Sequence, residues 1–129
     1  MAKEVIRPEG MFNSPAYAHA IKKTGTPVFI SGQVAADADG KLVGGSDPKA
    51  QAMQVFENLR TVVHACGGDM NDIVKITVFT TGLSYRPAIG EARAAFFEPG
   101  QFPASTFLVV SSLAEPGWLV EIEAVAMIE

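Results

Sequence analysis

The chain has 129 residues, of which 48% are hydrophobic and 19% are charged, and its formal net charge is −4 at pH 7. This length predicts one domain, residues 1–129, with a sizeable core, and the apolar content excludes a disordered chain. The negative charge and the lack of a basic cluster beyond Lys22 and Lys23 argue against a nucleic-acid partner. No apolar run is long enough to span a bilayer, and the start lacks the apolar centre of a secretory signal. We therefore expect a cytoplasmic protein with no membrane partner.

The first part of the chain predicts short strands. Residues 4–6 fit an edge strand, and Lys23–Thr26 fits a hairpin turn that leads from Tyr17–Lys22 into a strand at Pro27–Ser31. Gly32 follows that strand at once. A glycine at this position suggests a β-bulge or a close approach of another group to the backbone.

Two helices and one strand follow with clearer signals. The first helix begins at Pro48, which suits the first helical position after an Asp47 cap, and it ends at Gly67–Gly68. Its apolar residues recur at helical spacing and form one stripe: Ala52, Val55, Phe56, Leu59, Val62 and Val63. A strand is predicted at Ile73–Phe79, and a second helix from about Pro87 to Phe97.

The chain ends in two apolar runs, 104–113 and 118–128, which we expect to pair as closing strands around a Pro116–Gly117 turn. Side chains of a strand alternate between its faces, so Glu121 and Glu123 share one face of the last strand. The order of strands and helices predicts an α+β fold, in which two helices pack on one face of a mixed sheet.

The other face of this sheet has an unusual composition. It would mix polar with apolar side chains: Lys75, Thr77, Glu121 and Glu123 with Phe79, Phe107, Val109, Val125 and Met127. Carboxylates are costly to bury without partners, and an exposed apolar patch usually marks an interaction site. We therefore expect a homo-oligomer with this face at a subunit contact, where ligand pockets often form.

Four stretches of the chain resemble the RidA/YjgF family, which is also known as endoribonuclease L-PSP: Phe29–Val34, Asp72–Phe79, Phe102–Ala104 and Val120–Ala126. The resemblance covers nearly the whole chain in the right order. It implies a fold similar to chorismate mutase, and a homotrimer whose sheet faces form a central barrel-like core with three clefts between subunits. It also implies the hydrolysis, without a cofactor, of reactive enamines or imines to 2-oxo acids and ammonia.

The resemblance points to several site residues. Glu121 matches the acid that positions or activates the attacking water, and the alternative is a structural acid paired with Lys75 across the sheet. Tyr17 corresponds to a cleft tyrosine, or else is a half-buried strand residue. Ser31 and Gly32 would present a hydroxyl and a backbone group to a ligand, or would belong to a bulge that only bends the strand.

The main departure from the family lies at Ser105, where the best-understood members carry the arginine that holds the substrate carboxylate. Serine offers a neutral hydrogen bond in place of a charged fork, so we expect Ser105 to line the substrate pocket. Arg93 is a candidate for the missing cation. The alternative is an exposed helical arginine paired with Glu91 or Glu98.

Three functions are open from the sequence. They are a deaminase of a small imine or amino-substituted acid, a non-catalytic small-molecule binder or metabolic regulator on the same scaffold, and a ribonuclease, which the acidic charge disfavours. His19 would serve as an acid or base, or is simply an exposed histidine. His64 and Cys66 do not face each other on a helix, and two histidines with one cysteine make no zinc site, so we expect no metal.

Overall fold

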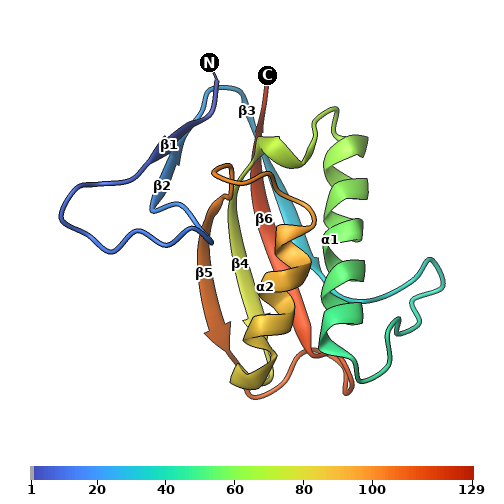
Figure 1. Cartoon of the computed structure of the whole chain (residues 1–129). Coiled ribbons are helices and arrows are strands. Elements are labelled where there is room, and N and C mark those ends of the chain that lie inside the picture. The colour runs from blue at the N-terminus through green and yellow to red at the C-terminus, as the bar shows by residue number, and fades with distance from the viewer. Residues whose placement is uncertain (1) are drawn as a thin grey trace.

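The computed structural model describes residues 2–129, and it contains a four-stranded sheet covered on one face by two helices (Figure 1). The sheet has the order β3-β6-β4-β5, and its strands are β3 Thr26–Gln33, β4 Ile73–Thr80, β5 Ala104–Val109 and β6 Val120–Ile128. The helices are α1 (Pro48–Ala65) and α2 (Arg86–Ala94). The predicted α+β fold is confirmed.

A second, two-stranded sheet lies beside β5 (Figure 1) and contains β1 (Glu4–Ile6) and β2 (Ala20–Lys22). The edge strand predicted at residues 4–6 is therefore confirmed. The predicted hairpin turn at 23–26 is wrong, because β2 pairs with β1 whereas β3 pairs with β6. Two short 3₁₀ turns, η1 (Met70–Asp72) and η2 (Leu83–Tyr85), flank β4.

Helix α1 begins as the sequence predicts. The Asp47 carboxylate accepts hydrogen bonds from the backbone N–H groups of Lys49 and Ala50, at 3.0 and 3.3 Å, and Pro48 occupies the first turn. The apolar stripe faces the sheet, where Val55, Phe56, Leu59 and Val63 are fully buried. Each such side chain stabilises the fold by roughly 1.5–3 kcal/mol.

No helix within residues 2–129 combines the length and apolar character needed to cross a lipid bilayer.

The two C-terminal strands do not pair with each other, which corrects the sequence prediction. β5 runs parallel to β4, because helix α2 carries the chain back across the sheet between them. β6 then inserts between β3 and β4 and is antiparallel to both. In this central position the backbone N–H and C=O groups of β6 form hydrogen bonds with a neighbouring strand on each edge. A simple hairpin with β5 would leave the groups on one edge of β6 unpaired.

The link between β5 and β6 is held by a buried glutamine that sequence reasoning missed. Gln51 of α1 is fully buried, and its amide nitrogen donates to the carbonyl oxygens of Gly45 and Gly117, at 2.7 and 2.8 Å. Its amide oxygen accepts from the backbone N–H of Leu119 at 2.9 Å. Because every strong contact of this amide is made to backbone, Gln51 fixes the path by which the chain enters β6.

The strand register decides which side chains face the helices. Val120, Ile122, Ala124 and Ala126 of β6 are buried under α1 and α2, so Glu121 and Glu123 point to the opposite, outer face, as predicted. Phe29 and Leu108 also lie on the outer face and are 79% and 42% exposed. The predicted placement of Phe107 and Val109 on this face is wrong, because they align with buried Val78 and Thr80 in the parallel β4–β5 ladder.

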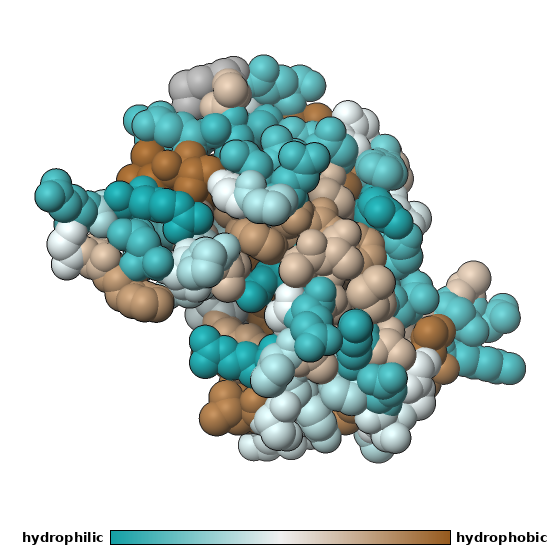
Figure 2. Space-filling model, viewed as in Figure 1, coloured by the Kyte–Doolittle hydropathy of each residue, from teal (hydrophilic) through white to brown (hydrophobic). Residues whose placement is uncertain are grey.

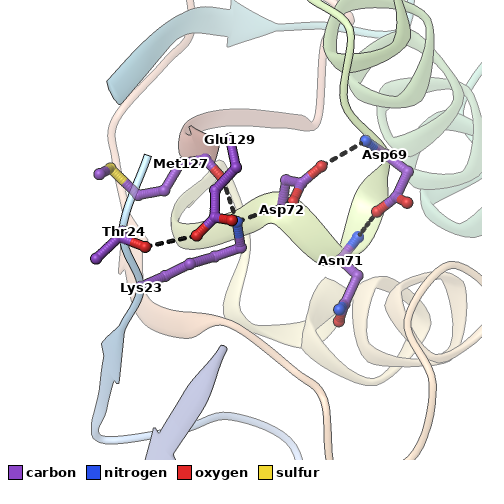
Figure 3. Close-up of polar contacts among 7 residues, drawn as sticks. All are labelled: Lys23, Thr24, Asp69, Asn71, Asp72, Met127 and Glu129. Carbon is purple, nitrogen blue, oxygen red and sulfur yellow. Dashed lines mark hydrogen bonds and ion pairs between the residues drawn. The ribbon is translucent and has the colours of Figure 1, made fainter. Parts of the chain in front are cut away.

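A polar cluster fixes the turn between β2 and β3 to the end of the sheet (Figure 3). The Lys23 ammonium lies 3.1 Å from the Asp72 carboxylate and donates to the Met127 carbonyl oxygen at 2.7 Å. Asp72 also accepts a hydrogen bond from the backbone N–H of Asp69 at 2.9 Å, which closes η1. Only 8% of the Lys23 side chain is exposed, so this cation is buried with its partners in place.

Candidate functional site

A pocket of about 250 Å³ lies between α2, β5 and the loop before β2. Figure 2 shows the surface hollowed between α2 and β5, with hydrophilic side chains next to hydrophobic ones. The pocket combines two arginines and three hydroxyl groups with small and apolar residues: Ser14, Ala16, Tyr17, Arg86, Ile89, Gly90, Arg93, Ser105 and Phe107. This composition suits a small polar anion with an apolar part.

The loop that carries Tyr17 is tied to the rest of the protein on both sides. The Arg7 guanidinium donates to the carbonyl oxygens of Ser14 and Tyr17, at 2.9 and 3.2 Å. The backbone N–H of Ala18 donates to the Pro103 carbonyl at 3.2 Å, so the loop joins the start of β5. These contacts hold the Tyr17 ring at the pocket wall, where the sequence predicted a cleft tyrosine.

His19 lies next to Tyr17, with the two ring centroids 5.8 Å apart in an edge-to-face arrangement. Its Nε2 atom lies 2.6 Å from the carbonyl oxygen of Phe12, so this nitrogen acts as a hydrogen-bond donor. His19 does not line the pocket. Its position favours a role in holding the loop over a role as an acid or base.

Arg93 points into the pocket from α2, above a chain of packed phenylalanines. Phe56 stacks on Phe96 at 5.5 Å and meets Phe97 edge-on at 6.1 Å, and Phe97 lies 6.0 Å from Phe102. The Arg93 guanidinium carbon lies 5.9 Å from the centroid of the Phe102 ring. The aromatic core therefore sets the position of the ring on which this cation rests.

The Arg93 guanidinium has no counter-ion within residues 2–129. Its Nε atom is buried without a hydrogen-bond acceptor, and Glu91, a predicted partner, instead pairs with Lys49 at 3.4 Å. Glu98 makes no ion pair with it either. Burial lowers the pKa of Arg93, and the nearby positive charge of Arg86 lowers this pKa further. The interpretation of Arg93 as a surface arginine paired on its own helix is therefore wrong.

Ser105 lines the same pocket from β5. It aligns with Ile76 in the parallel ladder, and because Ile76 is fully buried beneath the helices, Ser105 also points towards α2. The structure thus brings together three of the predicted substrate-binding residues, Tyr17, Arg93 and Ser105.

The other predicted site residues lie on the opposite face of the sheet. β3 has a register shift between Ile30 and Gln33, so the expected bulge falls at Ser31 and Gly32. A Cβ atom added at Gly32 would lie 2.0 Å from Oε2 of Glu121, so only glycine leaves room for this carboxylate as it stands. Ser31, Gly32 and Glu121 therefore form one surface, which we call the acid patch, and it does not reach the pocket within one chain.

Glu121 does not pair with Lys75. It aligns with Phe79 across the sheet, whereas Lys75 aligns with Val125 and donates to the Thr106 hydroxyl at 2.6 Å. Glu121 is half-buried, and within residues 2–129 no hydrogen bond or ion pair holds its carboxylate. The structural alternative for this acid thus lacks its partner.

Sequence reasoning missed Arg86 and Gly90 as pocket residues. The signal was available, because Arg86 and Arg93 are seven residues apart and so share one face of a helix, with Gly90 between them. Cys66, in contrast, is exposed at the end of α1. Among residues 2–129, no three His, Cys, Asp or Glu side chains gather where they could hold a metal ion.

Comparison with known proteins shows the same family over nearly the whole chain. The model of the family described as Endoribonuclease L-PSP matches residues 11–128. A Rid-family protein of unknown function from Yersinia pestis is 38% identical, with 99% of this chain and 100% of that chain covered and a TM-score of 0.92. RidA from an Antarctic Psychrobacter species is 35% identical, with 96% and 94% covered and a TM-score of 0.74. A member of the YjgF/YER057c/UK114 family from Mycobacterium tuberculosis is 25% identical, with 98% and 100% covered and a TM-score of 0.69.

The match to the family model and the agreement in fold with these structures confirm the resemblance seen in the sequence. The chain belongs to the Endoribonuclease L-PSP family of Rid and YjgF proteins.

Proposed function

We propose that the protein is a cofactor-free deaminase that hydrolyses a small enamine or imine bearing a carboxylate to the oxo acid and ammonia. The observation that carries this proposal is the half-buried Arg93, whose guanidinium lines the pocket with a buried Nε atom that has no acceptor and with no counter-ion within residues 2–129. A partly buried cation without a partner is costly to the fold, and a bound carboxylate would offset that cost. Membership of the Rid family supports the reaction class.

In this proposal Arg93 takes over the role that the best-understood relatives give to an arginine at the position of Ser105. The substrate carboxylate pairs with the guanidinium, and the hydroxyls of Ser105 and Tyr17 add neutral hydrogen bonds. In this protein the cation is on α2 instead of β5, so position 105 on β5 carries only the small side chain of serine. The pocket therefore keeps space next to the carboxylate for the reacting carbon.

The chemistry needs one base and one water. Glu121 accepts a proton as the water oxygen bonds to the imine carbon, and the electron pair of the C=N bond moves to nitrogen. Glu121 passes this proton on to the nitrogen, which gives a carbinolamine. The carbinolamine hydroxyl then loses its proton to the nitrogen through Glu121, the C–N bond breaks with its electron pair on nitrogen, and ammonia leaves as the carbonyl forms. Arg93 stabilises the negative charge of the substrate throughout.

A second copy of the chain supplies Glu121 in this proposal, because the acid patch and the pocket lie on opposite faces of one sheet. The outer face presents exposed Phe29 and Leu108 close to the acid patch on the same sheet, and such apolar side chains favour association. The proposed assembly is a ring of three copies, in which each acid patch lies against the pocket of a neighbour.

Two single variants test the proposal on enzymatically generated imines. Glu121→Gln should lower kcat by about 10²–10⁴-fold, since it removes the base. Arg93→Gln should mainly raise KM, because it removes the carboxylate anchor. The proposal is wrong if the wild-type protein accelerates no imine's decay above the buffer rate, or if Glu121→Gln leaves the rate unchanged.

Mixing the two variants tests whether the site lies between copies. When Glu121→Gln and Arg93→Gln chains are co-expressed with different tags, about a third of the clefts in mixed trimers carry both native residues. Activity should then return to that fraction of the wild-type rate. If the mixed oligomers stay as inactive as their parents, the two residues do not act in a shared cleft.

A non-catalytic binder or regulator is the second candidate. The observation that favours it is that the pocket lining of one chain contains no carboxylate and no histidine, and so no general base. Thermal-shift measurements against small oxo acids and amino acids, followed by product analysis, separate the two. Ligands that raise Tm but are recovered unchanged, with no imine consumed, would favour the binder.

Ribonuclease activity, which the family's description names, is not part of this proposal. The chain carries a net charge of −4, and RNA binding needs a concentrated positive surface. We expect no retention on an RNA column at low salt and no RNA cleavage. Binding at low salt that is lost at higher salt would contradict this expectation.

A further inference from the structure

The pocket holds a second cation that the proposed reaction does not use. Arg86 opens helix α2, lines the pocket beside Phe107, and makes no ion pair within residues 2–129. The protein as a whole is acidic, with a net charge of −4, and yet this pocket has two guanidinium groups and no carboxylate in its lining. Two like charges in one small cavity repel each other, which is costly unless anions occupy it.

The two guanidinium groups lie over two different aromatic rings. Arg86 lies over the Phe107 ring at 5.4 Å from the centroid, and Arg93 lies over the separate Phe102 ring at 5.9 Å. Their positions on α2 are seven residues apart, which is roughly 10 Å along a helix axis. A single small anion such as phosphate would favour two arginines that point at one place, whereas this arrangement offers two anion positions.

From this geometry we propose that the substrate carries two carboxylates, one held by Arg93 next to the reacting carbon and the second held at the far end of the pocket by Arg86. This inference rests on the proposed function and extends it to a substrate class, the imines and enamines of short dicarboxylic acids. Arg86 is then a specificity residue.

The size of the pocket fits that class. Its volume of about 250 Å³ equals the space of roughly eight liquid water molecules. A dicarboxylic oxo acid of four or five carbons has a similar number of non-hydrogen atoms. Gly90 and Ala16 contribute small residues to the lining, and Ile89 and Phe107 supply apolar contact for the carbon chain.

Calorimetric binding of product analogues tests the inference without needing turnover. Oxaloacetate and 2-oxoglutarate are the dicarboxylate probes, 2-oxobutanoate is the monocarboxylate probe, and inorganic phosphate is the third arm. Wild-type protein should bind a dicarboxylate about 10- to 100-fold more tightly than the monocarboxylate, as one charged hydrogen bond contributes about 1.5–3 kcal/mol. Phosphate should bind more weakly than either dicarboxylate.

Variants then assign the two positions. Arg86→Gln should remove the dicarboxylate preference and leave 2-oxobutanoate affinity within about twofold, whereas Arg93→Gln should weaken all three oxo acids by about 10-fold or more. Arg86→Lys should recover part of the preference. Arg60→Gln is the matched control, because it removes the same charge from an arginine that also lies over a phenylalanine, Phe96, but outside the pocket.

Several outcomes would overturn the inference. These are equal affinity of the wild-type protein for mono- and dicarboxylates, no binding of any oxo acid in the millimolar range, or an equal effect of Arg86→Gln on both classes. Tighter binding of phosphate than of the dicarboxylates would also overturn it. A dicarboxylate preference without imine turnover would overturn the proposed deaminase activity but support the two-anion site. Turnover of monocarboxylate imines alone would support the deaminase activity and overturn the two-anion site.

Discussion

Two partly enclosed cations in this molecule have opposite surroundings. Lys23 lies between Asp72 at 3.1 Å and the Met127 carbonyl at 2.7 Å, as Figure 3 shows. Arg93 is half-buried above Phe102 and has a buried Nε atom with no acceptor. A buried charge that has its partners serves the fold, and one that lacks them is costly to the fold and is available to a ligand.

Lys23 and Arg93 also lie in different kinds of place, one where segments of the fold are joined and the other at a pocket. Lys23 joins the β2–β3 turn, η1 and the last strand, three segments that are distant in sequence. Arg93 lies on one side of a pocket whose walls come from α2, β5 and a loop. Substitutions at the two positions should therefore change stability in opposite directions.

The largest effect is expected at Lys23. Lys23→Met should lower the free energy of unfolding by about 3 kcal/mol, because it leaves the Asp72 carboxylate, 21% exposed, without its cation. Urea denaturation followed by circular dichroism measures this change. Lys49→Met is the matched control, since its pair with Glu91 is exposed and should contribute less than about 1 kcal/mol. Equal effects at the two lysines would remove the contrast.

At Arg93 the sign should reverse. Arg93→Met keeps an unbranched side chain over Phe102 and removes an unpaired charge. The free energy of unfolding should therefore rise by about 1–2 kcal/mol. Ligand binding should be lost in the same variant. A rise in Tm together with the loss of oxo-acid binding is the expected combination in thermal-shift experiments.

Arg60→Met provides the comparison for this variant. Arg60 lies 5.0 Å from the Phe96 ring centroid and has a carboxylate partner, Glu57, so its removal should be neutral or slightly destabilising. If Arg93→Met lowers Tm as much as a core substitution does, Arg93 is a structural residue and the binding role is wrong.

The smallest effect is expected at Gly90, which lies between the two pocket arginines on α2. Gly90→Ala should stabilise the helix by about 0.5–1 kcal/mol. The new methyl would lie 3.7 Å from Nη2 of Arg93, an ordinary contact, so it fits the free protein but takes ligand space. Affinity for oxo acids should fall a few-fold by calorimetry.

A different glycine provides the control for that substitution. Gly100 has a φ of 78° and lies outside the pocket, so Gly100→Ala should destabilise the protein by about 1 kcal/mol without changing affinity. If both alanine variants shift stability in the same direction, the effect at Gly90 does not arise from helix propensity.

Much of the fold could be predicted because local signals and the hydrophobic pattern agree. The Asp47 cap, Pro48 and the stripe that includes Phe56 define α1, and alternation places Glu121 on the outer face. Strand pairing could not be predicted from the same signals. The sequence pattern predicts strands at residues 104–109 and 120–128. It does not predict that β6 pairs with β3 and β4 while β5 lies at the edge of the sheet.

The candidate site was predicted as a cleft between subunits, and a single chain holds only parts of it. The family resemblance assigned residues 17, 31, 32, 105 and 121 to a cleft between subunits, and the sheet places Ser105 and Glu121 on opposite faces of one chain. A β-sheet separates neighbouring positions into two surfaces, so residues of one site can lie on different faces of a single chain. Whether they meet depends on how copies associate.

By itself, the sequence determined the two helices, the strand segments and the family, because these follow from short-range spacing and from matching stretches of residues. The tertiary structure decided which cations have partners. Arg93 and Lys23 look alike in a sequence, since a charge does not reveal its neighbours. Only the packing of α2 over Phe102, and of the β2–β3 turn against Asp72, leaves one of them open to a ligand and the other closed.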